Sequence, residues 1–331
     1  KKGHRIYLKH MLLTEQGTPL LPNWAFFLRC FLNTRNLRPT ASRENFYENE
    51  ELELAKTEFS NAVKYYFQEL SRNNPKILQK IVSVHFEAIK SMAVWDDEIF
   101  LLFIDYLPFS TSYGELTGAA LKKVGEAVYI DDISRFKQLK PIFHAQDRLL
   151  ICTGYNSDHP LISKLAQMFS LPITPLQEEN MGLVLEDVTF QEQQEAFGLL
   201  RAINLGLKDF DCQAELRRFY PIDLPALYYI SDDVQFLRQV QNAQETSSGI
   251  FSEALSSLLS DVAQKPLSTL YLNRNSPLIQ RLLYLKNEKM LQSVAKVLYI
   301  HALVTGGHSL HREELKTLSQ ELLYLIDYNE N

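Results

Sequence analysis

The chain has 331 residues, of which 46% are hydrophobic and 22% are charged, a balance typical of globular proteins that excludes a disordered or fibrous one. The formal net charge is −6 and no block of Lys or Arg stands out, so the electrostatic basis of a dedicated nucleic-acid binder is missing. The longest apolar runs, 99–104 and 24–28, are much shorter than the roughly 20 residues that span a bilayer. We therefore expect neither a nucleic-acid partner nor a membrane segment.

The cysteines and the N-terminus bear on the cellular compartment of the protein. Cys30, Cys152 and Cys212 are odd in number and have no CxxC spacing, which argues against disulfides and zinc and favours buried thiols in a reducing cytoplasm. The pair His308 and His311 lacks further ligands nearby, so we expect no metal site. The N-terminus has no signal peptide and no starting Met, and we interpret the chain as a fragment whose upstream part is missing.

The first third of the chain is predicted to be largely helical. Hydrophobic periodicity and turn residues predict, in chain order, a strand at 5–13, a short helix at 24–32, a loop at 33–42 and helices at 51–71, 75–91 and 95–107.

The pattern changes after residue 112. Alternating strands and helices are predicted at 127–130, 132–139, 148–153, 159–169 and 171–176. This β-α-β-α-β order indicates an α/β fold with a mostly parallel sheet. No glycine-rich phosphate loop follows either buried strand, so the pattern gives no support for a nucleotide site within this unit.

A boundary is predicted near 175–180, and a second set of elements follows it. We predict helices at 191–207, 231–244, 251–263, 277–286, 288–305 and 312–327, with strands at 214–219, 226–230 and 268–272.

The last two helices carry apolar stripes that predict dimerisation. We expect them to pair with their symmetry copies in a four-helix bundle, and the alternative is an intramolecular helical hairpin. The stripe of the final helix comprises Leu315, Leu318, Leu322, Leu325 and Ile326, and that of the helix before it comprises Leu291, Val294, Val297, Leu298 and His301.

Several segments resemble the heat-shock protein 90 (HtpG-like) family of molecular chaperones. Residues 21–46, with Leu-Pro, an aromatic-rich stretch, a polar loop and Ser-Arg-Glu, resemble its middle domain, and 270–282 resemble its Leu-x-Leu-Asn-x-x-x-Pro-Leu-Ile-x-x-Leu motif. Residues 149–155, 159–171 and 219–231 resemble further parts of the middle and C-terminal domains. The ordered set covers essentially the whole chain and is typical of a divergent branch.

The resemblance implies an α/β (α+β) fold in four parts. These are the C-terminal part of a first middle-domain α/β unit at 1–55, a helical connector at 56–110, a second middle-domain α/β unit with α/β/α layers at 111–180, and a C-terminal domain at 181–331 that ends in the dimerisation bundle.

The resemblance also implies a function. The chain would be the middle and C-terminal part of a cytoplasmic, ATP-dependent stress-response chaperone that binds non-native client proteins as a homodimeric clamp. ATP, with Mg²⁺, would be bound mainly by a missing N-terminal domain of the same protein, so this fragment alone should not hydrolyse ATP. The alternative is a non-catalytic scaffold or regulatory dimer that keeps the fold. An independent hydrolase or transferase is disfavoured, because the sequence has no G-x-S-x-G motif, metal cluster or phosphate loop.

By the same resemblance Arg43 would contact the γ-phosphate of ATP, supported in its loop by Thr40, Ser42, Glu44 and Tyr47. An always charged, planar guanidinium suits a transferring phosphoryl group. The alternative is a helix-start arginine paired with Glu44 or Glu48. Tyr47 stands where the family has a glutamine and Thr40 where it has an asparagine, which puts the auxiliary contacts in question.

Client contact would use exposed aromatic side chains, because chaperones need apolar surface. The alternative is that these residues belong to the core. The candidates are Trp24, Phe26, Phe27, Trp95, Phe100 and Phe109.

Overall fold

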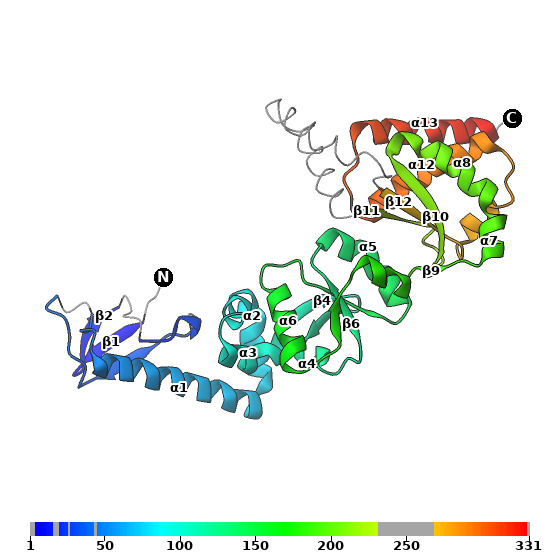
Figure 1. The fold of residues 1–331 in the computed structure, drawn as a ribbon. Coiled ribbons are helices and arrows are strands. Elements are labelled where there is room, and N and C mark those ends of the chain that lie inside the picture. Colours follow the sequence, from blue (N-terminus) through cyan, green and yellow to red (C-terminus); the bar gives the residue numbers. More distant parts are fainter. Residues whose placement is uncertain (1–3, 16–19, 26, 43–44, 231–267, 330–331) are drawn as a thin grey trace, which may run out of the picture. The chain divides into compact units, whose positions relative to one another are not determined.

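The computed structural model describes residues 4–15, 20–25, 27–42, 45–230 and 268–329 (Figure 1). The chain divides into two compact units, each described by itself below. Unit 1 comprises Lys1–Ser110, Gly114–Glu126 and Thr153–Ile173, and unit 2 comprises Thr111–Tyr113, Ala127–Cys152 and Thr174–Asn331. The predicted mixed α and β class is confirmed, whereas the predicted layering and the four-part division stay predictions.

Unit 1 begins with a three-stranded sheet in the order β2-β1-β3. β1 (Arg5–Leu8) and β2 (Met11–Thr14) form an antiparallel hairpin, and β3 (Phe31–Thr34) runs parallel to β1. The hairpin turn is made by Lys9 and His10, with φ of 48° and 70°. The strand predicted at 5–13 is therefore two strands.

The helix predicted at 24–32 is wrong. The described part of this stretch holds a 3-10 turn, η1 (Asn23–Ala25), and then β3. The run of aromatic residues fits either secondary structure, and pairing with β1 decides in favour of the strand.

Three helices follow, and their ends have clear causes. Asn49 caps α1 (Glu50–Asn73) by accepting a hydrogen bond from the backbone N–H of Leu52 at 3.0 Å. α2 (Pro75–Ala93) starts with its proline, and Asp96 caps α3 (Asp97–Phe103), which continues as η2 (Ile104–Tyr106). The predicted helices 51–71 and 75–91 are confirmed, and the third begins later than predicted because Asp96 is its cap.

A hairpin that the sequence did not predict follows these helices in the chain. β4 (Pro108–Thr111) and β5 (Gly114–Thr117) flank a turn in which Gly114 has a φ of 96°, a conformation that favours glycine. α4 (Gly118–Leu121) follows directly, and α6 (Asp158–Met168) matches the predicted helix at 159–169.

A buried ion pair joins α2 to α6. The Lys90 Nζ lies 2.7 Å from Asp158 Oδ1, with side-chain exposures of only 5% and 3%. The ammonium also lies 4.6 Å from the centroid of the Phe109 ring. Burial raises the pKa of Asp158, and the charge of Lys90 opposes that rise.

Unit 2 contains the central part of the predicted α/β pattern. β6 (Ala127–Ile130) and β7 (Leu149–Cys152) are parallel, and α5 (Ile133–Ala145) connects them. The Leu176 N–H, just after β8 (Ile173–Pro175), donates to the carbonyl of Tyr129, and Thr111 pairs antiparallel with Ile151. The predicted strand-helix-strand order is confirmed, with one antiparallel neighbour added.

A four-stranded sheet in the order β11-β12-β10-β9 forms the C-terminal part of unit 2. β12 (Ser268–Asn273) lies between β10 (Cys212–Arg218), to which it is parallel, and β11 (Ala226–Ile230), to which it is antiparallel. The short β9 (Glu186–Asp187) pairs with the end of β10. The predicted helices 231–244 and 251–263 lie outside the described residues.

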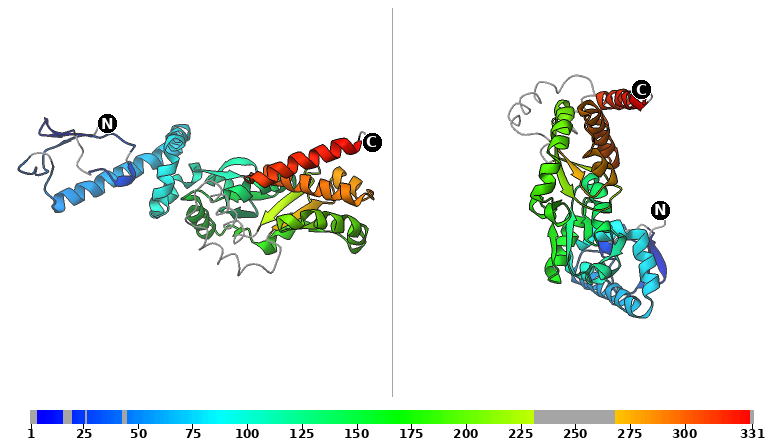
Figure 2. Two further views of the ribbon diagram at one scale, coloured as in Figure 1. Left: turned by 90° about the horizontal axis from the view of Figure 1, so that it is seen from above. Right: turned by 90° about the vertical axis from the view of Figure 1, so that its right-hand side faces the viewer.

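Helices accompany this sheet, and α12 lies side by side with both α8 and α13 (Figures 1 and 2). The stretch predicted as one helix at 191–207 forms two helices, which are separated at Ala196. The elements are η3 (Glu178–Leu183), α7 (Phe190–Glu195), α8 (Phe197–Leu207), η4 (Lys208–Phe210), α11 (Pro277–Leu282), α12 (Glu288–Thr305) and α13 (Arg312–Asn329).

One hydrophobic core crosses the boundary predicted near 175–180. Phe136 and Ile142 of α5 belong to the same buried cluster as Val184, Phe219 and Leu227. The Gln138 side chain donates a hydrogen bond to the carbonyl of Tyr228, and the Arg135 guanidinium lies 4.8 Å from the centroid of the Tyr229 ring. The α5 helix and the C-terminal sheet are therefore packed against each other as parts of one core.

Candidate functional site

The predicted phosphate-contacting loop is a short hairpin. Pro39 and Phe46 face each other in an antiparallel bridge. The Thr40 N–H donates to the Asn45 carbonyl at 2.8 Å, and the Tyr47 N–H donates to the Arg38 carbonyl at 2.9 Å. These bonds hold the two arms of the loop together on either side of its tip.

The arms are anchored in the core of unit 1. Leu37 and Phe46 are 8% and 3% exposed and belong to a cluster with Ile6, Leu20 and Leu52. Both arms of the loop are thus attached to buried side chains of this cluster.

Two of the predicted supporting residues do organise the loop. The Thr40 hydroxyl donates to the Asn45 carbonyl at 3.1 Å, and the Ser42 hydroxyl lies 3.2 Å from the Thr40 hydroxyl. The Thr40 side chain thus makes its contacts inside the loop.

The side chain of Tyr47 contacts the opposite arm of the loop. The Arg38 guanidinium lies 5.3 Å from the centroid of its ring, and the side chain is 47% exposed. Tyr47 therefore stacks on the arm of the loop through its ring face. Arg43 and Glu44, at the tip, lie outside the described residues, so the phosphate contact stays a prediction.

The predicted client contacts separate into core and surface residues. Trp24 is only 7% exposed and packs edge-to-face on Phe67 at a centroid distance of 6.2 Å, and Phe100 and Phe109 are also buried. For these three the prediction of an exposed contact is wrong, because their rings fill the helical core. Trp95, in contrast, is 88% exposed.

Phe27 and Phe26 complete the set of predicted client contacts. Phe27 is half-buried and stacks on His85 at a centroid distance of 5.2 Å. Phe26 lies outside the described residues. Among the candidates that the structure describes, Trp95 therefore has the most accessible ring.

The predicted dimerisation residues of α12 are mostly interior. Leu291 and Leu298 are each 4% exposed and lie in the core formed with α8 and the sheet, and Val294 packs against that core. The predicted interface stripe of α12 is therefore corrected: Leu291 and Leu298 stabilise their own domain.

The predicted apolar stripe of α13 contains both packed and exposed side chains. Leu318 packs against the core and Leu325 is half-buried, whereas the other members face solvent. The exposed apolar side chains are Leu315 (50%), Leu322 (43%), Ile326 (57%) and the additional Leu323 (61%).

Polar contacts hold α13 against α12 within the chain. The Tyr299 hydroxyl donates to Glu314 at 3.0 Å, and Lys296 pairs with Glu321 at 2.7 Å. Burial alone would raise the pKa of Glu321, but its hydrogen bonds and the Lys296 charge lower it. The hairpin alternative thus holds for one side of α13, and the other side remains available to a partner.

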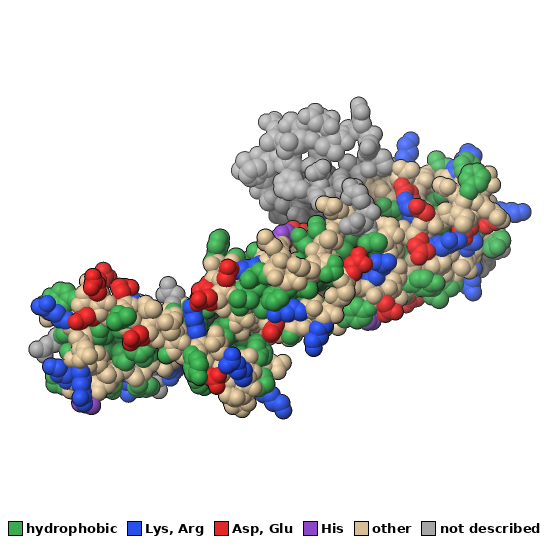
Figure 3. Space-filling view, turned by 60° about the horizontal axis from the view of Figure 1, so that its bottom comes forward, with side chains coloured by type: hydrophobic (Ala, Val, Ile, Leu, Met, Phe, Trp, Pro, Cys, Tyr) green, Lys and Arg blue, Asp and Glu red, His purple; other side chains and the backbone are tan. Residues whose placement is uncertain are grey.

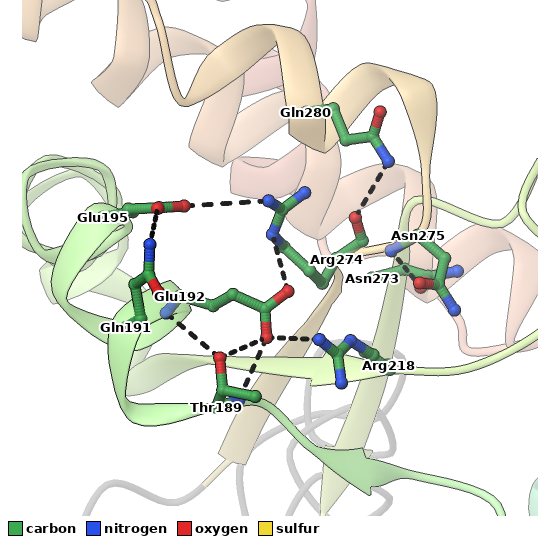
Figure 4. A network of polar contacts seen from close by, with 9 residues as sticks. All are labelled: Thr189, Gln191, Glu192, Glu195, Arg218, Asn273, Arg274, Asn275 and Gln280. Atoms are coloured by element: carbon green, nitrogen blue, oxygen red, sulfur yellow. Dashed lines mark hydrogen bonds and ion pairs between the residues drawn. The ribbon is translucent and has the colours of Figure 1, made fainter.

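A polar network that sequence reasoning missed lies at the ends of β10 and β12 (Figure 4). Glu192 accepts hydrogen bonds from the backbone and hydroxyl of Thr189, at 3.0 and 2.9 Å, as part of a capping box for α7. It also accepts from Arg218 and lies 3.6 Å from Arg274. Burial would raise the pKa of Glu192, but the hydrogen bonds from Arg218 and Thr189 lower it to about 2.

Asn273 fixes the loop that precedes β11. It is fully buried, and its amide donates to the carbonyls of Pro221 and Leu224 at 3.2 and 3.0 Å. Its side-chain oxygen accepts from the N–H groups of Phe219 and Asn275 at 3.3 and 3.0 Å. This explains the asparagine in the motif at 270–282, and its position at the end of a buried strand is the signal that could have identified it.

On the face drawn in Figure 3, Lys and Arg side chains of the described residues are interspersed with Asp and Glu. Among the described helices none is long and apolar enough to cross a bilayer. In the same part of the chain no three His, Cys, Asp or Glu side chains are grouped as metal ligands would be.

Comparison with curated proteins gives one consistent result. The chain is 21% identical over 324 residues to the chaperone protein HtpG of Borrelia garinii subsp. bavariensis, an alignment that covers 93% of this chain and 49% of that protein. HtpG of Borreliella burgdorferi is 20% identical over 323 residues, again with 93% and 49% covered. HtpG of Buchnera aphidicola subsp. Cinara cedri is 26% identical over 111 residues, or 34% of this chain and 18% of that protein.

These matches confirm the resemblance to HtpG chaperones of the heat-shock protein 90 family over nearly the whole chain, at low identity. The chain spans about half the length of the curated relatives that it matches over 93% of its residues. No protein-family model matches it.

Proposed function

We propose that this chain is the middle and C-terminal part of an ATP-dependent molecular chaperone of the heat-shock protein 90 family, which binds non-native client proteins as a homodimeric clamp. The observation that carries the proposal is the similarity to HtpG chaperones over 93% of the chain. Its direct test is suppression of the aggregation of a thermally unfolded reporter enzyme by the chain. Aggregation that proceeds unchanged at equimolar chain would contradict client binding.

In this proposal Arg43 contacts the γ-phosphate of a nucleotide held by a separate ATP-binding domain. Its support is the hairpin whose paired arms, 38–40 and 45–47, flank Arg43 in the sequence. Mg²⁺-ATP supplies the phosphoryl group, and the chain's own contribution is a cation delivered when the domains close, which stabilises the transition state more than the bound ground state.

The test of Arg43 uses a protein that includes the nucleotide-binding domain. We expect Arg43→Ala to lower steady-state ATP turnover while nucleotide binding stays nearly intact, and Arg43→Lys to rescue poorly because lysine lacks the bidentate fork. Arg35→Ala, at an exposed arginine that precedes the paired arms 38–40 and 45–47, is the matched control. Normal turnover in Arg43→Ala would favour the non-catalytic scaffold or regulatory dimer, with Arg43 in a local ion pair.

The homodimer is proposed to form through the exposed side of α13. Burying an exposed leucine or isoleucine there stabilises association by roughly 1.5–3 kcal/mol each. We therefore expect Leu322→Glu with Ile326→Glu to convert the dimer to a monomer in light scattering. Leu205→Glu, at a leucine of α8 with 50% exposure, should leave the mass unchanged. A wild-type chain that is monomeric at micromolar concentration would contradict this part of the proposal.

A further inference from the structure

A pocket of about 400 Å³ lies in unit 2 between α8 and the segment 283–288 that leads into α12. This volume is near the lower end of the roughly 300–1,000 Å³ typical of ligand sites. Its apolar lining consists of Leu199, Ala202, Leu283, Leu285 and Leu291.

Gly198 belongs to the lining of the pocket. A Cβ atom at Gly198 would have no atom within 4 Å. The exposed aromatic side chains of Phe197 (69%) and Tyr284 (85%) are adjacent in sequence to lining residues on the two sides of the pocket.

The charges at the rim favour an anionic partner. Within the described part of the chain neither Arg201 nor Lys286 makes an ion pair, and both are exposed. Of the two rim carboxylates, Glu195 is already engaged by Arg274 at 3.9 Å and by the Gln191 amide at 3.3 Å. Glu288 lies in the first turn of α12, where the helix dipole stabilises it. Two cations thus face one remaining carboxylate.

We propose that this pocket binds a short segment of a second protein in which an aliphatic side chain is flanked by carboxylates. The aliphatic side chain occupies the leucine-lined pocket, and the carboxylates pair with Arg201 and Lys286. The site goes beyond the chaperone proposal, because its partner is recognised by a defined chemistry and needs neither ATP nor a non-native client.

The test measures fluorescence anisotropy of a labelled, acetylated peptide of leucine and glutamate titrated with the 331-residue chain. We expect saturable binding that weakens with added salt, and no comparable binding of the leucine and lysine counterpart. Gly198→Leu should abolish binding by filling the pocket, and Arg201→Glu with Lys286→Glu should weaken it roughly tenfold or more. Two control variants lie outside the pocket: Gln193→Leu introduces a leucine on α7, and Lys208→Glu reverses a charge on η4. Both variants should bind the peptide normally.

Equal binding of both peptides, or unchanged binding by Gly198→Leu, would overturn the proposal. A fall in molecular mass on Gly198→Leu in light scattering would also overturn it, because the occupant would then be a second copy of the chain. Loss of peptide binding with intact aggregation suppression separates this site from the chaperone function.

Discussion

Replacing Lys90 by methionine should destabilise unit 1 strongly, because it leaves the carboxylate of Asp158 buried without its partner. The two side chains are 5% and 3% exposed and their charged atoms are 2.7 Å apart. Methionine preserves most of the aliphatic stem of Lys90, so the change removes mainly the charged group, which lies over the Phe109 ring.

The expected loss is large. Removing one partner of a buried ion pair costs about 3–5 kcal/mol. At about 2–4 °C per kcal/mol for a domain of 150–250 residues, the melting temperature should fall by roughly 6–20 °C. A matched surface change, Lys64→Met, removes the partner of Glu98, which is 70% exposed, and should cost at most about 1 kcal/mol.

The loss should depend on pH with a defined sign. Burial raises the pKa of Asp158, and Lys90 opposes that rise, so removing Lys90 raises this pKa further. A carboxyl whose folded pKa lies above its unfolded value destabilises the fold as pH rises through the folded pKa. Lys90→Met should therefore be most destabilised at neutral pH and recover partly as the pH falls toward 5.

The assay is urea unfolding followed by tryptophan fluorescence. The chain has two tryptophans, Trp24 and Trp95, and both belong to unit 1, so the signal reports on that unit. A double variant, Lys90→Met with Asp158→Leu, should recover much of the stability because no charge remains buried. A loss below about 1 kcal/mol in Lys90→Met, or a double variant whose loss is the sum of the single ones, would refute the reasoning.

Three further predictions concern packing and polar contacts. Glu192→Gln should lower the stability of unit 2 by about 1–2 kcal/mol at neutral pH. Because the folded pKa of Glu192 is about 2, its contribution to stability is present above pH 4.5 and lost as the pH falls toward 2. The free energy of unfolding of Glu192→Gln should therefore depend less on pH in this range than that of the wild type. Asn273→Ala leaves backbone groups of the preceding loop without partners and should cost about 2–4 kcal/mol in urea unfolding. Gly118→Ala places a Cβ 2.1 Å from the carbonyl oxygen of Ile104 and should lower the melting temperature, whereas Gly125→Ala, with no atom within 4 Å, should not.

Helices with a clear cap and a strong apolar period were predictable from the sequence. α1, α2 and α12 lie within a few residues of their predicted bounds, since Asn49, Pro75 and Asn287 mark where they begin. The stretch 24–32 could not be assigned in the same way, because long-range pairing of β3 with β1 decides its structure.

The candidate site was predictable only where a motif marks it. The loop around Arg43 was found by resemblance, and the Thr189-x-x-Glu192 capping box was readable but missed. The contacts of Glu192 with Arg218 and Arg274 join residues far apart in sequence, and no spacing rule predicts them. The stripe of α12 was assigned to a dimer because periodicity shows that a face is apolar without showing what covers it.

The shared core of unit 2 bears on how the proposed clamp can move. Phe136 of α5 and Leu227 of β11 are buried in one cluster, so separating the two elements would expose apolar surface at roughly 25 cal/mol per Å². The hydrogen bond from Gln138 to the Tyr228 carbonyl lies in the same region and would lose its partner in a buried setting. A change of angle between α5 and the C-terminal sheet is therefore costly. In the proposed clamp, opening and closing would have to come from elements outside this core.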